Sequence, residues 1–134
     1  MDQAILVRES VEAGSELVRT VNPRMPISAA FWLKEFDEPR WYLYLASDVL
    51  ENRGSLKGYQ LVREALDAVG GVPGIDLFQV KVVPSSNPFA REAAVLARQS
   101  FRNAPIQLGT TPFGGRTVED VYIYPNTVLD PVEH

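Results

Sequence analysis

Hydrophobic side chains recur at helical spacing in three segments of the chain. Residues 3–21 place apolar side chains every three or four positions, with charged residues on the other faces, which predicts an amphipathic helix. Residues 56–69 repeat the pattern and end at a Gly-Gly pair. Residues 85–101 form a third such segment, with Ser86 or Asn87 as the cap and a proline at the first helical position. The expected buried face of the second helix consists of Leu56, Tyr59, Val62, Leu66 and Val69.

Apolar and alternating runs predict five strands. The expected strands cover residues 27–36, 41–47, 76–83, 105–109 and 118–125. A short charged turn with a proline joins the first two into a hairpin, and a long glycine-containing loop at 110–117 joins the last two. In the third strand, Phe78, Val80 and Val82 alternate with polar residues, which indicates a half-buried strand.

The resulting order is α-β-β-α-β-α-β-β. Strand–helix–strand units favour a mixed sheet of about five strands flanked by three helices, an α/β fold in the α+β sense. The length of 134 residues suits one domain, and no linker or repeat divides it, so we expect a single domain over residues 1–134.

Composition restricts the chemistry open to this chain. Cysteine is absent and the only histidine is the last residue, His134, so thiolate nucleophiles, histidine triads and conventional zinc sites are not expected. We therefore expect no cofactor and no bound transition metal. The formal charge of −4 argues against nucleic acid as a partner. No apolar run is long enough for a membrane span and the N-terminus fits no signal peptide, so the expected location is the cytoplasm.

Aromatic residues gather on particular faces of the expected strands. Tyr42 and Tyr44 alternate with leucines, and Tyr122 and Tyr124 alternate with aliphatic residues, so each pair lies on one face of its strand. Trp32 joins the tyrosine side if Leu33 lies opposite Leu43, whereas a shift of one residue places Trp32 beside Leu43. The candidate aromatic face comprises Trp32, Tyr42, Tyr44, Tyr122 and Tyr124.

Two interpretations of this face remain open. An open face could bind a protein partner, form a homodimer or stack a planar ligand. Alternatively, a helix covers the face and the tyrosines belong to the core, because three helices are enough to cover both sides of a five-stranded sheet. We favour the core interpretation for at least two of the four tyrosines.

Arginines suggest a second candidate site. Arg91, Arg98 and Arg102 lie along one stripe of the third helix, and Arg116 follows two glycines in the 110–117 loop. Together they could bind a phosphate or another anion, although the loop does not match the phosphate-binding P-loop. We favour the ordinary explanations of the same residues, which are a solvated helix face and a long hairpin connection.

The leading functional hypothesis is a non-enzymatic interaction or accessory domain that binds a protein partner, or a second copy of itself, through the aromatic face. The alternative is a small enzyme or binding module for a phosphorylated or anionic ligand that uses these arginines. Arginines that converge with carboxylates in one pocket would favour the alternative.

Overall fold

The computed structural model describes residues 6–100 and 103–129. Its helices are α1 (Arg8–Val21), α2 (Gly54–Val69), α3 (Pro88–Gln99) and the short α4 (Asn126–Leu129), with 3-10 turns η1 (Asp48–Leu50) and η2 (Leu77–Gln79). Its strands are β1 (Ala29–Lys34), β2 (Tyr42–Ser47), β3 (Val80–Pro84), β4 (Ile106–Gln107), β5 (Thr111–Phe113), β6 (Arg116–Val118) and β7 (Asp120–Ile123). The predicted α+β class and the order of the elements are confirmed, with one small hairpin added.

A mixed five-stranded sheet organises the described residues. The strand order is β3-β2-β1-β7-β4, in which β3 runs parallel to β2 and all other neighbours are antiparallel. The helix α2 connects β2 to its parallel neighbour β3, as parallel strands require a long crossover. In this strand order, β3 and β4 are the two edge strands.

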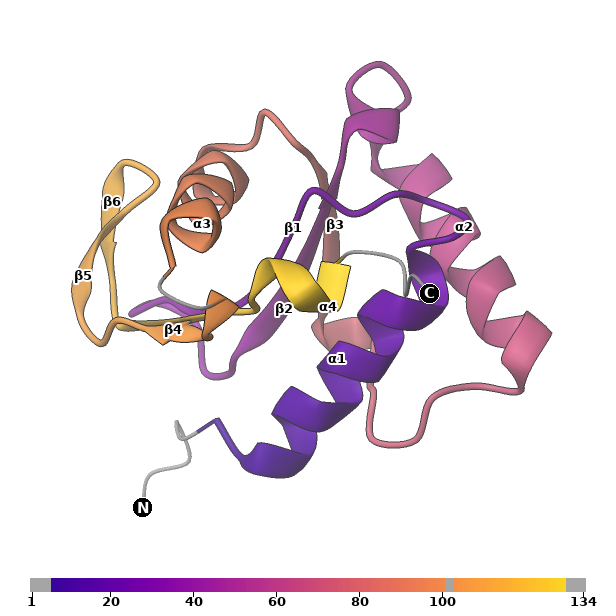
Figure 1. Ribbon diagram of the computed structural model, residues 1–134, viewed down its shortest axis with the longest axis horizontal. Coiled ribbons are helices and arrows are strands. Elements are labelled where there is room, and N and C mark those ends of the chain that lie inside the picture. The colour runs from indigo at the N-terminus through magenta and orange to yellow at the C-terminus, as the bar shows by residue number, and fades with distance from the viewer. Residues whose placement is uncertain (1–5, 101–102, 130–134) are drawn as a thin grey trace.

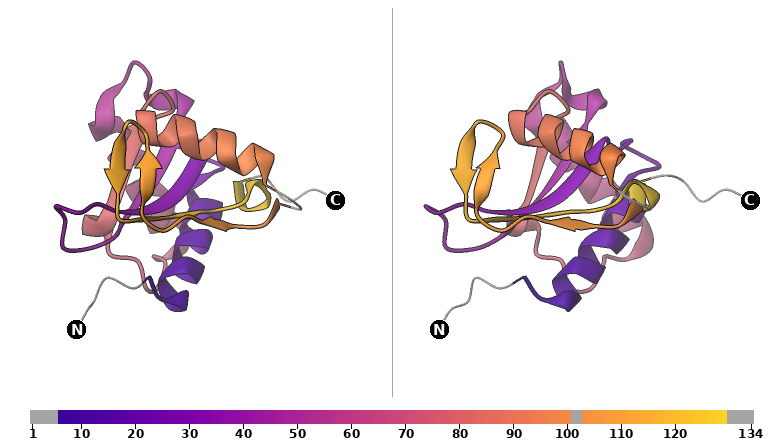
Figure 2. Two further views of the ribbon diagram at one scale, coloured as in Figure 1. Left: turned by 90° about the vertical axis from the view of Figure 1, so that its left-hand side faces the viewer. Right: turned by 60° about the vertical axis from the view of Figure 1, so that its left-hand side comes forward.

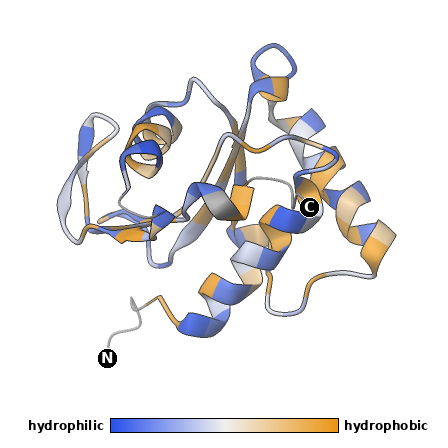
Figure 3. Ribbon diagram, in the orientation of Figure 1, coloured by the Kyte–Doolittle hydropathy of each residue, from blue (hydrophilic) through white to orange (hydrophobic). Residues whose placement is uncertain are grey.

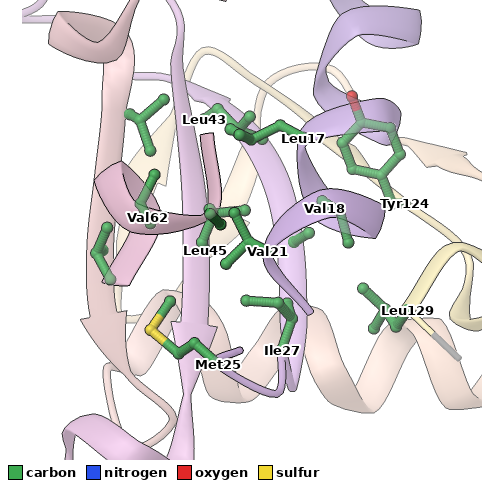
Figure 4. Close-up of a cluster of buried hydrophobic side chains, with 14 of the residues drawn as sticks. Leu17, Val18, Val21, Met25, Ile27, Leu43, Leu45, Val62, Tyr124 and Leu129 are labelled. Atoms are coloured by element: carbon green, nitrogen blue, oxygen red, sulfur yellow. The ribbon is translucent and has the colours of Figure 1, made fainter. Parts of the chain in front are cut away.

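Helices cover the two faces of this sheet unequally. The helices α1 and α2 pack on one face, whereas α3 and the β5–β6 hairpin pack on the other (Figures 1 and 2). The first core joins α1 and α2 to β2 through side chains that include Leu17, Val21, Leu43, Leu45 and Val62 (Figure 4). The second core joins α3 and the hairpin to β1, β2 and β7 through Phe31, Leu33, Tyr44, Ala93 and Phe113. Both cores are needed because every central strand carries apolar residues on both faces.

Local sequence signals explain where α2 and α3 end or begin. The Asn87 side chain accepts the backbone N–H groups of Phe89 and Ala90, and Pro88 occupies the first turn, so the predicted cap of α3 is confirmed. Gly70 ends α2 in the left-handed conformation, with φ of 79°.

The segment predicted as a long loop is instead the β5–β6 hairpin. Its two-residue turn consists of Gly114 and Gly115, whose φ values of 61° and 95° suit a tight hairpin turn. Phe113 at the end of β5 is fully buried, which holds the hairpin against α3. The segment does connect two antiparallel strands, as predicted, but its own two strands were missed because it is short and polar apart from this one anchor.

The predicted buried face of α2 is also partly wrong. Val62 and Leu66 are buried, but Leu56 is 73% exposed and Val69 is 59% exposed. The helix approaches the sheet at Gly58, where an added Cβ would come within 2.5 Å of a Val82 methyl group. This close approach turns the helix so that Leu56 faces outward.

Phe78 lies outside the strand that the alternation predicted. The Asp76 carboxylate accepts the Phe78 backbone N–H at 2.9 Å, which forms the turn η2, and the strand begins only at Val80. As a result, the Phe78 side chain is 88% exposed.

Candidate functional site

The candidate aromatic face does not exist as one surface. Trp32 pairs with Leu43 of β2 and with Tyr122 of β7, so its side chain lies on the α1 face of the sheet. Phe31 pairs with Tyr44, which places the β2 tyrosines on the α3 face. The alternation within each strand is as predicted, but the inference that all four tyrosines share a face was wrong, because β1 separates β2 from β7 and sets the two pairs out of phase.

On the α3 face, Tyr44 belongs to a cluster of four aromatic rings. Its ring stacks on Phe31 at 5.0 Å and meets the edge of Phe89 at 5.9 Å, and Phe113 stacks on Phe89 at 5.8 Å. Burial, reinforced by the negative charges of nearby glutamates, raises the pKa of Tyr44 from 10.0 to about 12. Tyr44 is therefore a core residue.

At the margin of this cluster, Tyr42 remains partly exposed. The Lys81 ammonium lies 4.3 Å above the centre of the Tyr42 ring, in a cation–π contact. Of the two predicted tyrosines on the α3 face, Tyr42 is thus the one that stays partly exposed.

On the α1 face, the Tyr124 hydroxyl is the middle member of a short hydrogen-bond chain. The Trp32 indole N–H donates to the Tyr124 hydroxyl at 2.9 Å, and that hydroxyl donates to the Val11 carbonyl oxygen at 2.6 Å. Burial raises the pKa of Tyr124 above its ordinary value. Tyr122 packs edge-on against Tyr124 at 5.3 Å and is half-buried. The core interpretation is thus confirmed for Tyr44 and Tyr124.

The predicted arginines do not converge. Arg91 lines an open groove of about 500 Å³ between α3 and the β5–β6 hairpin, together with Glu92 and both hairpin glycines. Arg116 points away and pairs with Glu35 at 2.7 Å. Arg98 is exposed in the last turn of α3 outside the lining of this groove, and Arg102 lies outside the described residues.

Sequence patterns missed an exposed apolar surface beside the β3 edge. Phe78 and Leu56 are the most exposed large hydrophobic side chains among the described residues. Between α2 and η2 lies a groove of about 440 Å³, lined by Tyr59, Val62, Arg63, Leu77, Phe78 and Val80. We call Leu56, Tyr59, Arg63, Leu77 and Phe78 the α2–η2 surface. Two signals pointed to it: the Asp76 turn residue before Phe78, and Gly58 at the edge of the expected buried face of α2.

Tyr59 closes the neighbouring sheet edge. Its hydroxyl donates to the Val80 carbonyl oxygen at 3.1 Å and accepts the Val82 backbone N–H at 3.3 Å. These are the groups that an added strand would pair with at this edge. A partner at the α2–η2 surface must therefore bind through side chains at this position rather than extend the sheet.

Arg63 gives the α2–η2 surface a positive charge. Among the residues that the structure describes, no carboxylate lies within 4.0 Å of its guanidinium group. The groove thus combines aromatic and aliphatic walls with one cation that is free to pair with a ligand.

Metal chemistry and known relatives add no further site. Residues 6–100 and 103–129 contain no cluster of three or more histidine, aspartate or glutamate side chains that could hold a metal ion. Within the same residues, no helix has both the length and the apolar character needed to cross a membrane. Comparisons of the chain with models of protein families, with curated proteins and with solved structures found no match. Function is therefore inferred from the geometry of the chain itself.

Proposed function

We propose that this chain is a non-enzymatic interaction domain that binds a protein partner through the α2–η2 surface. The observation that carries the proposal is Phe78, whose side chain is 88% exposed although its backbone is fixed in an ordered turn. Large aromatic side chains are costly to leave in water, and they dominate binding energies when an interface buries them.

The shape of the surface supports a side-chain anchor as the bound group. The groove of about 440 Å³ is large enough for a leucine- or phenylalanine-sized side chain, and Val62 and Val80 form its floor between the more exposed residues. Arg63 at the margin favours a carboxylate next to that anchor. The partner chemistry is therefore an apolar side chain close to an acidic residue.

The aromatic residues proposed to bind the partner differ from those that the sequence suggested. Tyr44 and Tyr124 are held in the core, so they stabilise the fold and cannot anchor a partner. Tyr59 and Phe78 are aromatic residues that lie at the surface beside a groove. The proposed interface therefore lies at the edge of the sheet and not on its face.

Photo-crosslinking tests the proposal even for a partner of unknown identity. A benzophenone amino acid replaces Phe78 in one variant and Phe36 in a control, because Phe36 is also an exposed phenylalanine, at 58%, but lies on the β1–β2 turn. We expect irradiation of cells that express each variant to give a discrete protein adduct at position 78 and none of matching yield at position 36. Equal yields at the two positions, or no adduct at position 78, would contradict the proposal.

A second candidate function is anion binding in the groove beside α3. Arg91 lines one groove together with Gly114 and Gly115, although the arginines that the alternative hypothesis combines do not converge there. The Glu92 carboxylate opposes it, because it already accepts the Gly114 N–H at 2.7 Å. Titration with inorganic phosphate, followed by NMR of these two glycine amides, tests this candidate. Shifts that disappear in Arg91→Gln would support it, and unchanged amides in the wild-type chain would remove it.

A further inference from the structure

We infer that the partner at the α2–η2 surface is a second copy of this chain, docked so that the two α2 helices lie antiparallel and cross at Gln60. This inference rests on the proposed function, because it names the occupant of the same surface. It is carried by the order of charges along α2, which the fold of one chain does not explain.

The charges of α2 oppose its own dipole. Cations are favourable near the C-terminus of a helix and anions near the N-terminus. The helix α1 has Glu9 beside Arg8 in its first turn and Arg19 in its last turn, and α3 has Arg98 in its last turn. By contrast, α2 has Lys57 in its first turn and Asp67 in its last.

Besides Arg63, three charged residues of α2 and the arginine that precedes it lack ion-pair partners among the described residues. Arg53, Lys57, Glu64 and Asp67 form no ion pair with another residue among those that the structure describes. At 100° per residue, all four fall within an arc of about 80° on the helix. Three of the four residues are exposed and Lys57 is half-buried, whereas the buried residues Val62, Ala65 and Leu66 lie on the opposite side of the helix. Figure 1 shows that one side of α2 is not covered by another element. Figure 3 shows hydrophobic and hydrophilic residues side by side along this helix.

The spacing of these charges is self-complementary. Gln60 is the midpoint between Arg53 and Asp67, and the midpoint between Lys57 and Glu64 falls directly beside it. In an antiparallel pair that crosses at Gln60, Arg53 of each copy therefore lies level with Asp67 of the other, and Lys57 lies within one residue, about 1.5 Å, of the level of Glu64. A two-fold axis repeats every contact, so Arg53, Lys57, Glu64 and Asp67 of each copy lie near an opposite charge of the other.

The same register supplies the apolar anchor. Leu56 is 73% exposed and lies on the flank of this arc. In the antiparallel pair, Leu56 of one copy comes within one residue of the level of Arg63 of the other, and Arg63 lines the groove next to Phe78. The dimer thus brings a leucine side chain to the margin of the groove, which is the apolar part of the partner chemistry proposed above. Because Tyr59 closes the β3 edge, helix pairing rather than strand addition is the available mode.

Charge reversal tests both the occupant and the register. In sedimentation velocity, the wild-type chain should be a dimer. Lys57→Glu places two carboxylates opposite each other, and Glu64→Lys places two ammonium groups opposite each other, so each variant alone should dimerise at least about tenfold more weakly. A mixture of the two variants should recover a heterodimer, since every reversed charge then meets its opposite. Asp37→Lys, an equal reversal on the β1–β2 turn, should leave the dimer unchanged.

Circular dichroism and urea unfolding establish that each variant is folded, as expected for substitutions on the outer side of α2. A monomeric wild-type chain, or a mixture that fails to associate, would overturn the inference. A monomeric chain that still crosslinks to another protein at position 78 would leave the proposed function standing and remove the second copy as occupant. Loss of both the dimer and the crosslink would remove both.

Discussion

The indole N–H of Trp32 donates to the hydroxyl of Tyr124 at 2.9 Å, and this bond joins β1 to the residue that follows β7 beneath α1. The Tyr124 hydroxyl in turn donates a hydrogen bond to the Val11 carbonyl oxygen in α1. Both rings are buried, so the chain of hydrogen bonds satisfies polar groups that would otherwise be costly in the core. Two members of the predicted aromatic face thus fix a helix to the sheet.

Gly14 allows this contact, and its replacement should destabilise the protein. A Cβ at this position would collide with the Tyr124 hydroxyl and lie 3.1 Å from the Trp32 indole nitrogen. Although alanine favours a helix over glycine by about 1 kcal/mol, we expect Gly14→Ala to lower the free energy of unfolding by about 1–3 kcal/mol. Urea unfolding measures the change.

Removal of the colliding oxygen provides the control. In Gly14→Ala combined with Tyr124→Phe, the loss should be smaller than the sum of the two single losses, because the main collision is gone. Strict additivity would show that Gly14 matters for another reason.

The raised pKa of Tyr44 predicts a loss of stability in alkali. Its pKa is 10.0 in the unfolded reference and about 12 in the folded chain, so the unfolded chain loses this proton first. The contribution is fully present below pH 10 and declines as the pH rises from about 10 through 12. We expect the urea midpoint of Tyr44→Phe to fall less steeply over this range than that of the wild type. Identical slopes would show that the Tyr44 hydroxyl stays protonated in both states or ionises in both alike.

Lys34 is a buried cation whose removal should cost more than the removal of its acidic partner. Its ammonium donates to the carbonyl oxygens of Glu35 and Glu38 and pairs with the Glu119 carboxylate at 3.1 Å. Lys34→Met leaves both carbonyls without this donor, so we expect a loss of about 2–3 kcal/mol in the free energy of unfolding. Glu119→Gln keeps those bonds and should cost about 1 kcal/mol. Comparable losses in the two variants would mean that the ion pair, and not the carbonyl contacts, holds Lys34 in place.

The Tyr59 hydroxyl should protect the β3 edge. Tyr59→Phe removes the donor to Val80 and the acceptor for Val82, and we expect about 1 kcal/mol lower stability. Hydrogen exchange at the Val82 amide should accelerate, because this amide loses its acceptor. Tyr42→Phe serves as the control, since the Tyr42 hydroxyl lies on the opposite face of the sheet. An unchanged rate at Val82 in Tyr59→Phe would show that water or another group already takes this role.

Periodicity predicted most of the fold because it reports which side chains avoid water along one element. The cap at Asn87, the stop at Gly70 and the alternation in β2 and β7 are all local, and all were predicted correctly. The shared tyrosine face depended on the register of β1 between β2 and β7, and a change of one residue reverses the face. That register is set by packing on both sides of the sheet, which no local pattern contains.

The candidate surface escaped prediction for a similar reason. Leu56 continues the helical pattern of α2, so it was expected in the core, but the close approach at Gly58 turned it outward. Phe78 continues the alternation of β3, but the hydrogen bond from its backbone to Asp76 delays the start of the strand. In both cases one specific contact overrode a hydrophobic pattern.

Peptide affinity tests the α2–η2 surface most directly. Peptides selected from a random library on the immobilised wild-type protein can be titrated calorimetrically against wild type, Phe78→Ser and Phe36→Ser. Both exposed phenylalanines should be replaceable without loss of fold. We expect Phe78→Ser to weaken binding at least about tenfold, because aromatic anchors at the centre of an interface contribute about 2 kcal/mol, and Phe36→Ser to leave it unchanged. Peptides that bind Phe78→Ser as tightly as wild type would contradict the assignment of this surface.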